Sequence, residues 1–277
     1  MLLGIKRWVM AFRNQIIGLI RFSYPALNGF TQSSEDVAAD RARLFSEDRL
    51  TARFHLFEAL TLPSMRAQTD PDHRLGVLVG EGLPPWARDR LEAALSGLPD
   101  AHVVSLPPMK HYQATQAAFA RLADDRATHL TSFRLDDDDA VDRRLIARLR
   151  SLADGLTTMA GRDRIVTIAF NRGFFLELDP AGNRIFDVTE KLPLGIGLAM
   201  TAPVASRENI FRRNHRLLPQ FFTTYSDAET PAFIRTVHPG NDSDAHLTGT
   251  RDTMPPARIA REISRAFPFS QEDLLAL

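Results

Sequence analysis

Four consecutive carboxylates, Asp136–Asp139, follow the apolar-rich stretch Leu130–Leu135, which reads as a strand. Four like charges in a row repel one another, so a group of opposite sign is expected among them. Mg²⁺ and Mn²⁺ are the simplest candidates, because they prefer carboxylate oxygens. Ligands of open α/β sheets bind beyond the carboxyl ends of the strands. The sequence therefore predicts a divalent-cation site where this strand ends.

Side chains alternate along a strand, which places Asp136 and Asp138 on one side and Asp137 and Asp139 on the other. An Asp-x-Asp pair can hold a metal ion that also contacts a diphosphate. Such an ion acts as a Lewis acid and offsets the charge that develops on a departing phosphate. The alternative is a solvated acidic turn at the start of the next helix.

Composition limits the classes of function. The chain has 277 residues, 44% of them hydrophobic, with 34 basic and 34 acidic side chains. This balance gives no electrostatic case for nucleic-acid binding. There are no cysteines, which excludes disulfides and thiolate metal sites and fits a reducing compartment. We expect a cytoplasmic protein.

Charged residues interrupt the apolar N-terminus, Met1–Phe22. No run reaches the roughly 20 residues that span a bilayer, and no cleavage site follows a clean apolar stretch. We interpret residues 2–12 as a docking segment or a frayed end. The alternative is a short basic amphipathic helix in peripheral contact with the inner face of a membrane.

The first 155 residues alternate strand and helix. We expect strands at 15–23, 75–79, 102–106 and 130–135, and helices at 46–63, 84–95, 112–122 and 141–156, with an irregular loop at 24–45. Four repeats of this alternation predict parallel strands joined by right-handed crossovers. Neither glycine-rich phosphate-binding motif, GxGxxG or GxxxxGK[ST], occurs in the chain. A nucleotide would therefore have to be bound in another way, and a metal ion on paired aspartates would provide one.

The second half has a mixed pattern. We expect a strand at 165–170, a hairpin of 174–178 and 184–188, a short helix at 206–213, a strand at 232–238, a helix at 256–267 and a capping box of Ser270 and Asp273. Gly195 and Gly197 indicate a close approach of the backbone to another group. We interpret the change near residue 160 as a switch within one domain.

Several residues together resemble the GT-A glycosyltransferases, and more closely the putative rhamnosyltransferase family of bacteria. They are Arg21–Ser23, Leu62–Ser64 with Gln68, Arg134–Asp139, and Val237–His238 with Asn241 and Ser243. The resemblance covers about Ile16 to Ser243. It implies a single GT-A-like domain over 1–277, with a mostly parallel central sheet flanked by helices and a mixed or antiparallel C-terminal half. Residues 15–155 would bind the nucleotide sugar and residues 156–277 the acceptor.

The resemblance also implies transfer of a sugar, with rhamnose as a candidate, from a nucleoside-diphosphate sugar to a hydroxyl of a glycan or small-molecule acceptor. This would serve surface polysaccharide or glycan synthesis. Mn²⁺ or Mg²⁺ would be held by Asp138, Asp136, Asp139 and the late-strand His238. Asp136 would touch ribose or metal, and Asp137 would lie on the donor side. Alone, His238 would be read as a packed or surface histidine.

Further residues complete the expected site. Arg21, with Ser23, lies at the carboxyl end of the first strand and either binds the diphosphate or pairs with an aspartate. An inverting enzyme needs a carboxylate base opposite the leaving group. The candidates are Glu190, Glu208, Asp227 and Glu229, and we favour Asp227, which precedes the His238 strand. Competing functions are a metal-dependent nucleotidyltransferase and a non-enzymatic calcium-binding protein.

Overall fold

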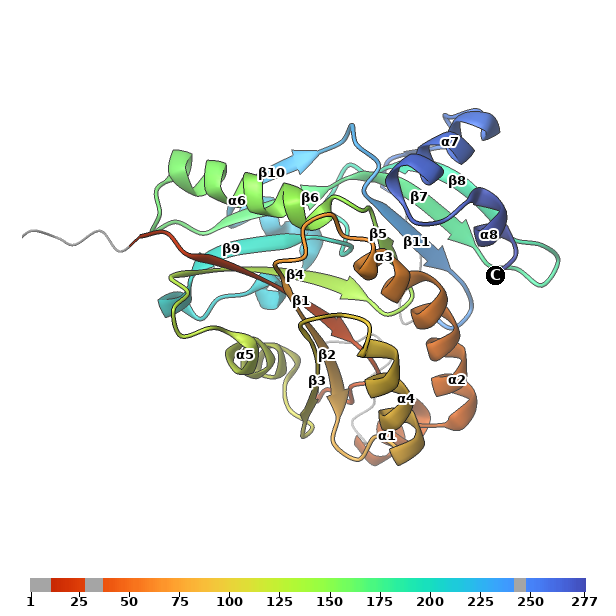
Figure 1. Cartoon of the computed structure of the whole chain (residues 1–277), viewed down its shortest axis with the longest axis horizontal. Helices are drawn as coiled ribbons and strands as arrows, with labels where there is room; N and C mark the ends of the chain where they lie inside the picture. Colours follow the sequence, from red (N-terminus) through yellow and green to blue (C-terminus); the bar gives the residue numbers. More distant parts are fainter. Residues whose placement is uncertain (1–10, 28–36, 242–247) are drawn as a thin grey trace, which may run out of the picture.

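A seven-stranded sheet forms the centre of the computed structural model, which describes residues 11–27, 37–241 and 248–277 (Figure 1). In spatial order it contains β10 (Thr223–Asp227), β6 (Val166–Phe170), β9 (Ala199–Pro203), β4 (His129–Asp136), β1 (Asn14–Arg21), β2 (Arg74–Gly80) and β3 (Ala101–Leu106). Only β9 runs antiparallel to its neighbours. The expected mostly parallel α/β sheet is confirmed, and strands from both halves of the chain complete it.

A second sheet carries the C-terminal half. Its order is β12 (Thr250–Arg251), β8 (Arg184–Thr189), β7 (Arg172–Glu177), β11 (Phe233–Val237) and β5 (Ala140–Val141). β7 and β8 form the expected hairpin. β5 follows β4 after only three residues and pairs antiparallel with β11. The acidic tip of β4 is therefore the link from one sheet to the other.

Most helices cover the two faces of the central sheet, whereas the last two pack against the second sheet. The helices are α1 (Val37–Leu44), α2 (Glu47–Leu56), the π-helical turn η1 (Phe57–Thr61), α3 (Leu62–Arg66), α4 (Pro85–Leu95), α5 (His111–Leu122), α6 (Leu145–Ala160), α7 (Pro256–Ala266) and α8 (Gln271–Leu275). Three 3-10 turns, η2 (Val204–Ser206), η3 (Ile210–Arg212) and η4 (His215–Gln220), follow β9. None of the helices in the described ranges is both long and apolar enough to cross a bilayer.

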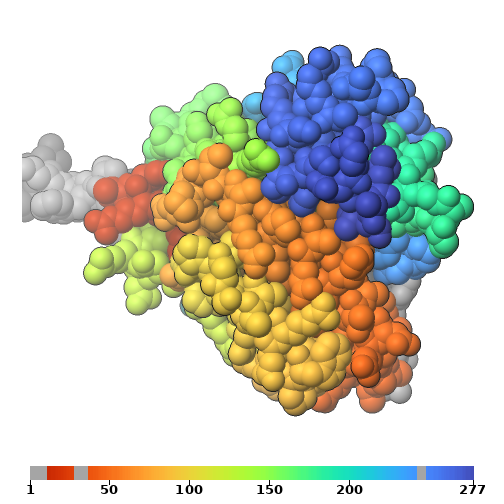
Figure 2. All heavy atoms as spheres, turned by 45° about the vertical axis from the view of Figure 1, so that its right-hand side comes forward, coloured from red at the N-terminus to blue at the C-terminus, as the bar shows by residue number. Residues whose placement is uncertain are grey.

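Alternating side chains of β1 divide the core. Ile16 and Ile20 pack with α2, α4 and α6, whereas Ile17 and Leu19 pack with α5. A third cluster joins α7 and α8 to α2 and η1 through Leu56, Leu60 and Ile263. Figure 2 shows the two C-terminal helices in dark blue directly against the orange segment that contains α2 and α3.

Several predicted boundaries were wrong. Helical structure continues past Pro63 to Arg66, because Leu62 donates to Phe57 in the π-helical turn and Pro63 then lies in the first turn of α3, where no amide donor is needed. Val141 belongs to β5, so the helix expected at 141–156 begins at Leu145.

Other elements had not been predicted. β9 and β10 were missed, α1 occupies part of the expected loop 24–45, and residues 206–213 contain 3-10 turns. The capping box of Ser270 and Asp273 is present. Residues 1–10, 28–36 and 242–247 lie outside the described residues, and with them most of the segment 2–12, part of the loop 24–45, and Ser243.

Two glycine substitutions test this packing, one in the central sheet and one on the exposed side of α6. A Cβ at Gly18 would lie 2.2 Å from Phe133 Cζ, so Gly18→Ala should lower the free energy of unfolding by about 1–3 kcal/mol. In α6, Gly155 has nothing within 4 Å of a built Cβ, so Gly155→Ala should raise it by about 0.5–1 kcal/mol. Urea denaturation measures both, and effects of the same sign would contradict this packing.

Candidate functional site

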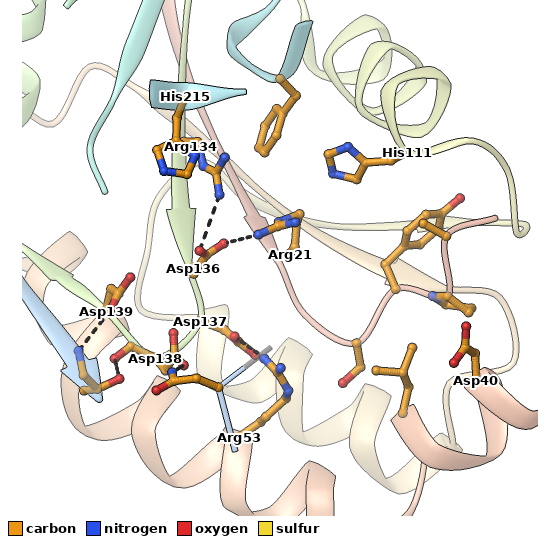
Figure 3. Close-up of a pocket in the computed structure, with 18 of the residues that line it drawn as sticks. Arg21, Asp40, Arg53, His111, Arg134, Asp136, Asp137, Asp138, Asp139 and His215 are labelled. Atoms are coloured by element: carbon orange, nitrogen blue, oxygen red, sulfur yellow. Dashed lines mark hydrogen bonds and ion pairs between the residues drawn. The ribbon is translucent and has the colours of Figure 1, made fainter. Parts of the chain in front are cut away.

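A polar pocket of about 580 Å³ lies where β1 and β4 end (Figure 3). It is lined by aspartates and arginines in close mixture: Asp40, Asp136, Asp137, Asp138, Asp139, Arg21, Arg43, Arg53, Arg134, Arg212, Arg213 and Arg235. The acidic tip therefore lies in a pocket and is not a solvated turn on open surface.

The four aspartates alternate in exposure as expected for a strand end. The side chains of Asp136 and Asp138 are 32% and 15% exposed, whereas that of Asp137 is 2% exposed and Asp139 is buried. The first pair thus faces the pocket more openly than the second.

Asp136 pairs with guanidinium groups. In the register of the two strands Asp136 lies beside Arg21, whose Nη2 is 2.6 Å from Asp136 Oδ1, and Arg134 Nη2 is 3.5 Å from Oδ2. Burial opposes ionisation, but the charges of Arg21 and Arg134 outweigh it and hold the pKa of Asp136 below its usual range. Asp136 is therefore a carboxylate turned toward two arginines. Of the two interpretations of Arg21, the structure contains the ion pair with an aspartate.

Asp137 and Asp139 are held by elements around the tip. Asp137 pairs with Arg53 of α2, and burial nevertheless raises its pKa to about 6, with the charge of Asp138 acting in the same direction. Its Oδ2 has no hydrogen-bond partner among the residues the structure describes. Asp139 Oδ1 accepts from the Thr236 amide at 3.1 Å, and burial raises its pKa well above the usual value.

Asp138 lies opposite the end of β11. His238 Nε2 is 3.2 Å and Asn241 Nδ2 is 3.0 Å from Asp138 Oδ2, and Thr236 Oγ1 donates to the Asp138 carbonyl at 2.9 Å. The pairing of β11 with β5 produces this arrangement. The structure brings Asp138 and His238 together across 100 residues of sequence, while their role as metal ligands stays a prediction.

The distance between Asp138 and His238 suits two neighbouring ligands of an octahedral ion. Neighbouring ligands at bond lengths of about 2.1 Å lie about 3 Å apart. The carboxylate oxygen and imidazole nitrogen, at 3.2 Å, meet that requirement. Within the described ranges, no three acidic, histidine or cysteine side chains converge as a complete ligand set. Asp138 and His238 therefore fit as two ligands, with the other positions open to substrate and water.

Ser23 is a buried, strained residue on the pocket wall. Its φ is +54°, it is 4% exposed, and its Oγ has no hydrogen-bond partner among the described residues. A left-handed backbone at a non-glycine residue is costly and often occurs at ligand sites. An unsatisfied buried hydroxyl facing a pocket is suited to hydrogen bond with a ligand.

Asp227 does not line this pocket. It ends the edge strand β10, where Oδ1 accepts from the amides of Glu229 and Thr230 and Oδ2 lies 3.5 Å from Arg148 Nη1. Asp227 thus stabilises a turn and takes part in a partly buried ion pair, which are structural contacts. The sequence could not indicate this, because β10 itself was not predicted.

The other three base candidates are also not among the residues that line the pocket. Glu190 accepts from Thr248, Glu208 accepts from Tyr112, and Glu229 is exposed. None of these carboxylates lines the pocket, so the identity of the base stays a prediction.

An aromatic ring under the two arginines was missed in the sequence. The guanidinium carbons of Arg134 and Arg21 lie 5.3 and 5.9 Å from the centre of the Phe211 ring, and His111 meets its edge at 5.5 Å. Phe211 is fixed because the neighbouring Ile210 amide donates to Ser132 Oγ on β4. The polar run that follows Phe211, Arg212–His215, was the available signal.

The close backbone approach expected at Gly195 is confirmed. A Cβ there would lie 2.9 Å from Arg134 Cζ, so only glycine lets this segment pass beside the guanidinium. Arg134 is thus packed between a glycine backbone and an aromatic ring.

The chain matches the family described as "Putative rhamnosyl transferase" over residues 15–250. It belongs to this family. The rhamnosyl transferase description makes the protein a glycosyltransferase, as the resemblance implied. No curated protein matches the chain.

Solved structures similar to this family member are distant from it. S. aureus TarS 1-349 in complex with UDP-GlcNAc is 12% identical with a TM-score of 0.45, covering 95% of this chain and 70% of that one. The same fragment with UDP is 10% identical with a TM-score of 0.43, covering 81% and 61%. A putative nucleotide-diphospho-sugar transferase from Desulfovibrio desulfuricans G20 is 8% identical with a TM-score of 0.36, covering 78% and 80%.

Histidines of the pocket should make stability depend on pH. Burial, then the charge of Arg134, lowers the pKa of His215 to about 3. The unfolded chain takes up this proton near pH 6.5 and the folded chain does not, so the stabilisation is lost as pH falls from about 6.5 toward 3. His215→Gln should flatten the fall in unfolding free energy by up to about 1.4 kcal/mol per pH unit. Urea titrations at pH 7, 6 and 5 measure this, and equal slopes in both proteins would contradict it.

Proposed function

We propose that this glycosyltransferase moves a sugar from a nucleoside-diphosphate sugar to a hydroxyl of a glycan or small-molecule acceptor. Rhamnose is the candidate sugar, and surface polysaccharide or glycan synthesis in the cytoplasm, in peripheral contact with the membrane, is the candidate setting. The carrying observation is the Asp138–His238 pair in one pocket with the buried guanidiniums of Arg21 and Arg134. A dianionic diphosphate requires such a combination of cation-binding and cationic groups.

The donor would lie against the ends of β1 and β4. Arg21 and Arg134 would orient the diphosphate oxygens, and the Ser23 hydroxyl would donate to a ribose or phosphate oxygen. Asp136 and Asp137 would assist on the donor side. The ion pairs of Asp136 with Arg21 and Arg134 support this role of the two arginines, because they fix both guanidinium groups before the donor binds.

Mn²⁺ or Mg²⁺ would be held by Asp138 and His238, with Asp136 and Asp139 as further candidate ligands. When bound, the ion would supply Lewis-acid stabilisation of the leaving diphosphate. Asn241 and Thr236 would orient Asp138, since both contact it. No carboxylate of the second half is assigned as the base.

Asp138→Asn tests the metal assignment. It should abolish the Mn²⁺-dependent part of donor binding, a loss of at least about tenfold in affinity, because a neutral amide is a poor ligand for hard cations. Calorimetry with nucleotide sugars, with and without Mn²⁺, measures it. Asp125→Asn is the matched control, because this carboxylate is exposed and has no hydrogen bond or ion pair among the described residues. Unchanged donor affinity in Asp138→Asn would contradict the assignment.

Ser23→Ala separates binding from stability. Removing a buried hydroxyl with no partner should leave the unfolding free energy equal or slightly higher, while donor affinity falls about three- to tenfold. Urea denaturation and donor calorimetry on the same preparation measure the two effects. Reduced stability with full donor affinity would show that the hydroxyl has a structural role instead.

A further inference from the structure

The pocket contains more positive charge than its own carboxylates balance. Among the described residues, seven arginines and five aspartates line it, a formal excess of two positive charges with the histidines neutral. Glu208, outside the lining, lies 3.4 Å from Arg212 and reduces the excess to one. A nucleoside-diphosphate donor would enter with a divalent cation of equal and opposite charge, so the excess would persist in the donor complex.

Two arginines of the pocket lack a carboxylate partner. Most guanidiniums of the pocket have a carboxylate within 4 Å: Arg21 and Arg134 pair with Asp136, Arg43 with Asp40, Arg53 with Asp137, and Arg212 with Glu208. The guanidinium groups of Arg213 and Arg235 have no ion pair or hydrogen bond in the described part of the chain. Arg213 lies 4.5 Å from the centre of the Phe221 ring, and Arg235 lies 5.3 Å from that of Phe175.

Of the two arginines, Arg235 gives the stronger evidence that a counter-ion is missing. It is half-buried on β11, one residue before Thr236 and three before His238. The charge of Arg235 acts on Asp139 and opposes the rise of its pKa, but Asp139 already accepts from the Thr236 amide. A half-buried guanidinium without a counter-ion is costly unless a ligand supplies one.

Both arginines come from the second half of the chain, whereas the proposed diphosphate contacts lie at the ends of β1 and β4. Arg213 connects η3 to η4, Arg235 lies on β11, and both line the same pocket as Arg21. The two arginines without a carboxylate partner therefore come from the half of the chain in which the acceptor groups are expected. Guanidinium groups bind phosphate and carboxylate oxygens through paired hydrogen bonds.

We propose that Arg213 and Arg235 form an anion-binding acceptor subsite, so that the acceptor carries a phosphate or carboxylate group beside the hydroxyl that receives the sugar. This rests on the proposed function and adds the chemical class of the second substrate. The oxyanion compensates the two guanidiniums and fixes the orientation of the acceptor. Neutral acceptors lack this interaction and bind more weakly.

The test uses the full chain saturated with Mg²⁺ and the nucleoside diphosphate, among UDP, GDP and dTDP, that raises its melting temperature most. Inorganic phosphate, acetate or neutral methyl glucoside is then titrated in and followed by calorimetry. Phosphate or acetate should bind and methyl glucoside should not, and the better anion identifies the acidic group. Arg213→Gln and Arg235→Gln should each weaken anion binding at least about fivefold, with nucleotide affinity within about twofold of wild type.

Controls separate this subsite from general electrostatics and from misfolding. Arg261→Gln removes the same charge from the exposed face of α7 and should change neither affinity. Arg235→Lys keeps the charge and should recover part of the anion affinity if Arg235→Gln folds poorly.

The outcomes distinguish the two proposals. Wild-type anion affinity in both glutamine variants, or an equal loss of nucleotide affinity, would overturn the subsite. Nucleotide binding without anion binding would overturn only this inference, and failure of every nucleotide to bind wild type would overturn the proposed function.

Discussion

The compensation of buried carboxylates by guanidinium groups is the constraint on which the site depends. Four aspartates in a row at a strand end would repel one another and resist burial. Here Asp136 is neutralised by two arginines and Asp137 by one, while Asp139 accepts a backbone amide. The acidic tip can therefore lie at the junction of two sheets instead of in open solvent.

Geometry divides the four carboxylates into two kinds. Asp137 and Asp139 point into the protein and anchor α2 and β11 to the tip. Asp136 and Asp138 face the pocket, and among the described residues an imidazole lies within hydrogen-bond distance of Asp138. The alternation of side chains along the strand thus separates the two buried carboxylates from the two that face the pocket.

Much of this could be predicted from the sequence because the signals were local. Continuous apolar runs predicted β1, β2 and β4, and the four carboxylates marked the end of β4 as the site. β9 and β10 were missed because Ala199–Pro203 and Thr223–Asp227 have neither clear alternation nor a long apolar run. Proximity across the fold was beyond local patterns: Arg53 and Phe211 reach the site only through tertiary packing. The position of Asp227 outside the pocket lining could not be foreseen, because its strand was not predicted.

The site also explains why the second sheet is attached where it is. β5 is only two residues long, yet its pairing with β11 determines the positions of Arg235, Thr236 and His238 relative to the tip. On the other side, η3 is tied to β4 through Ser132, which places Phe211 under the arginines. The site residues of both halves of the chain are thus positioned by contacts with β4 or with the residues that follow it. A shift of β4 by one residue would exchange the two faces of the acidic run and turn Asp138 away from His238. The register of β4 between β1 and β9 is therefore as much a requirement of the site as the aspartates themselves.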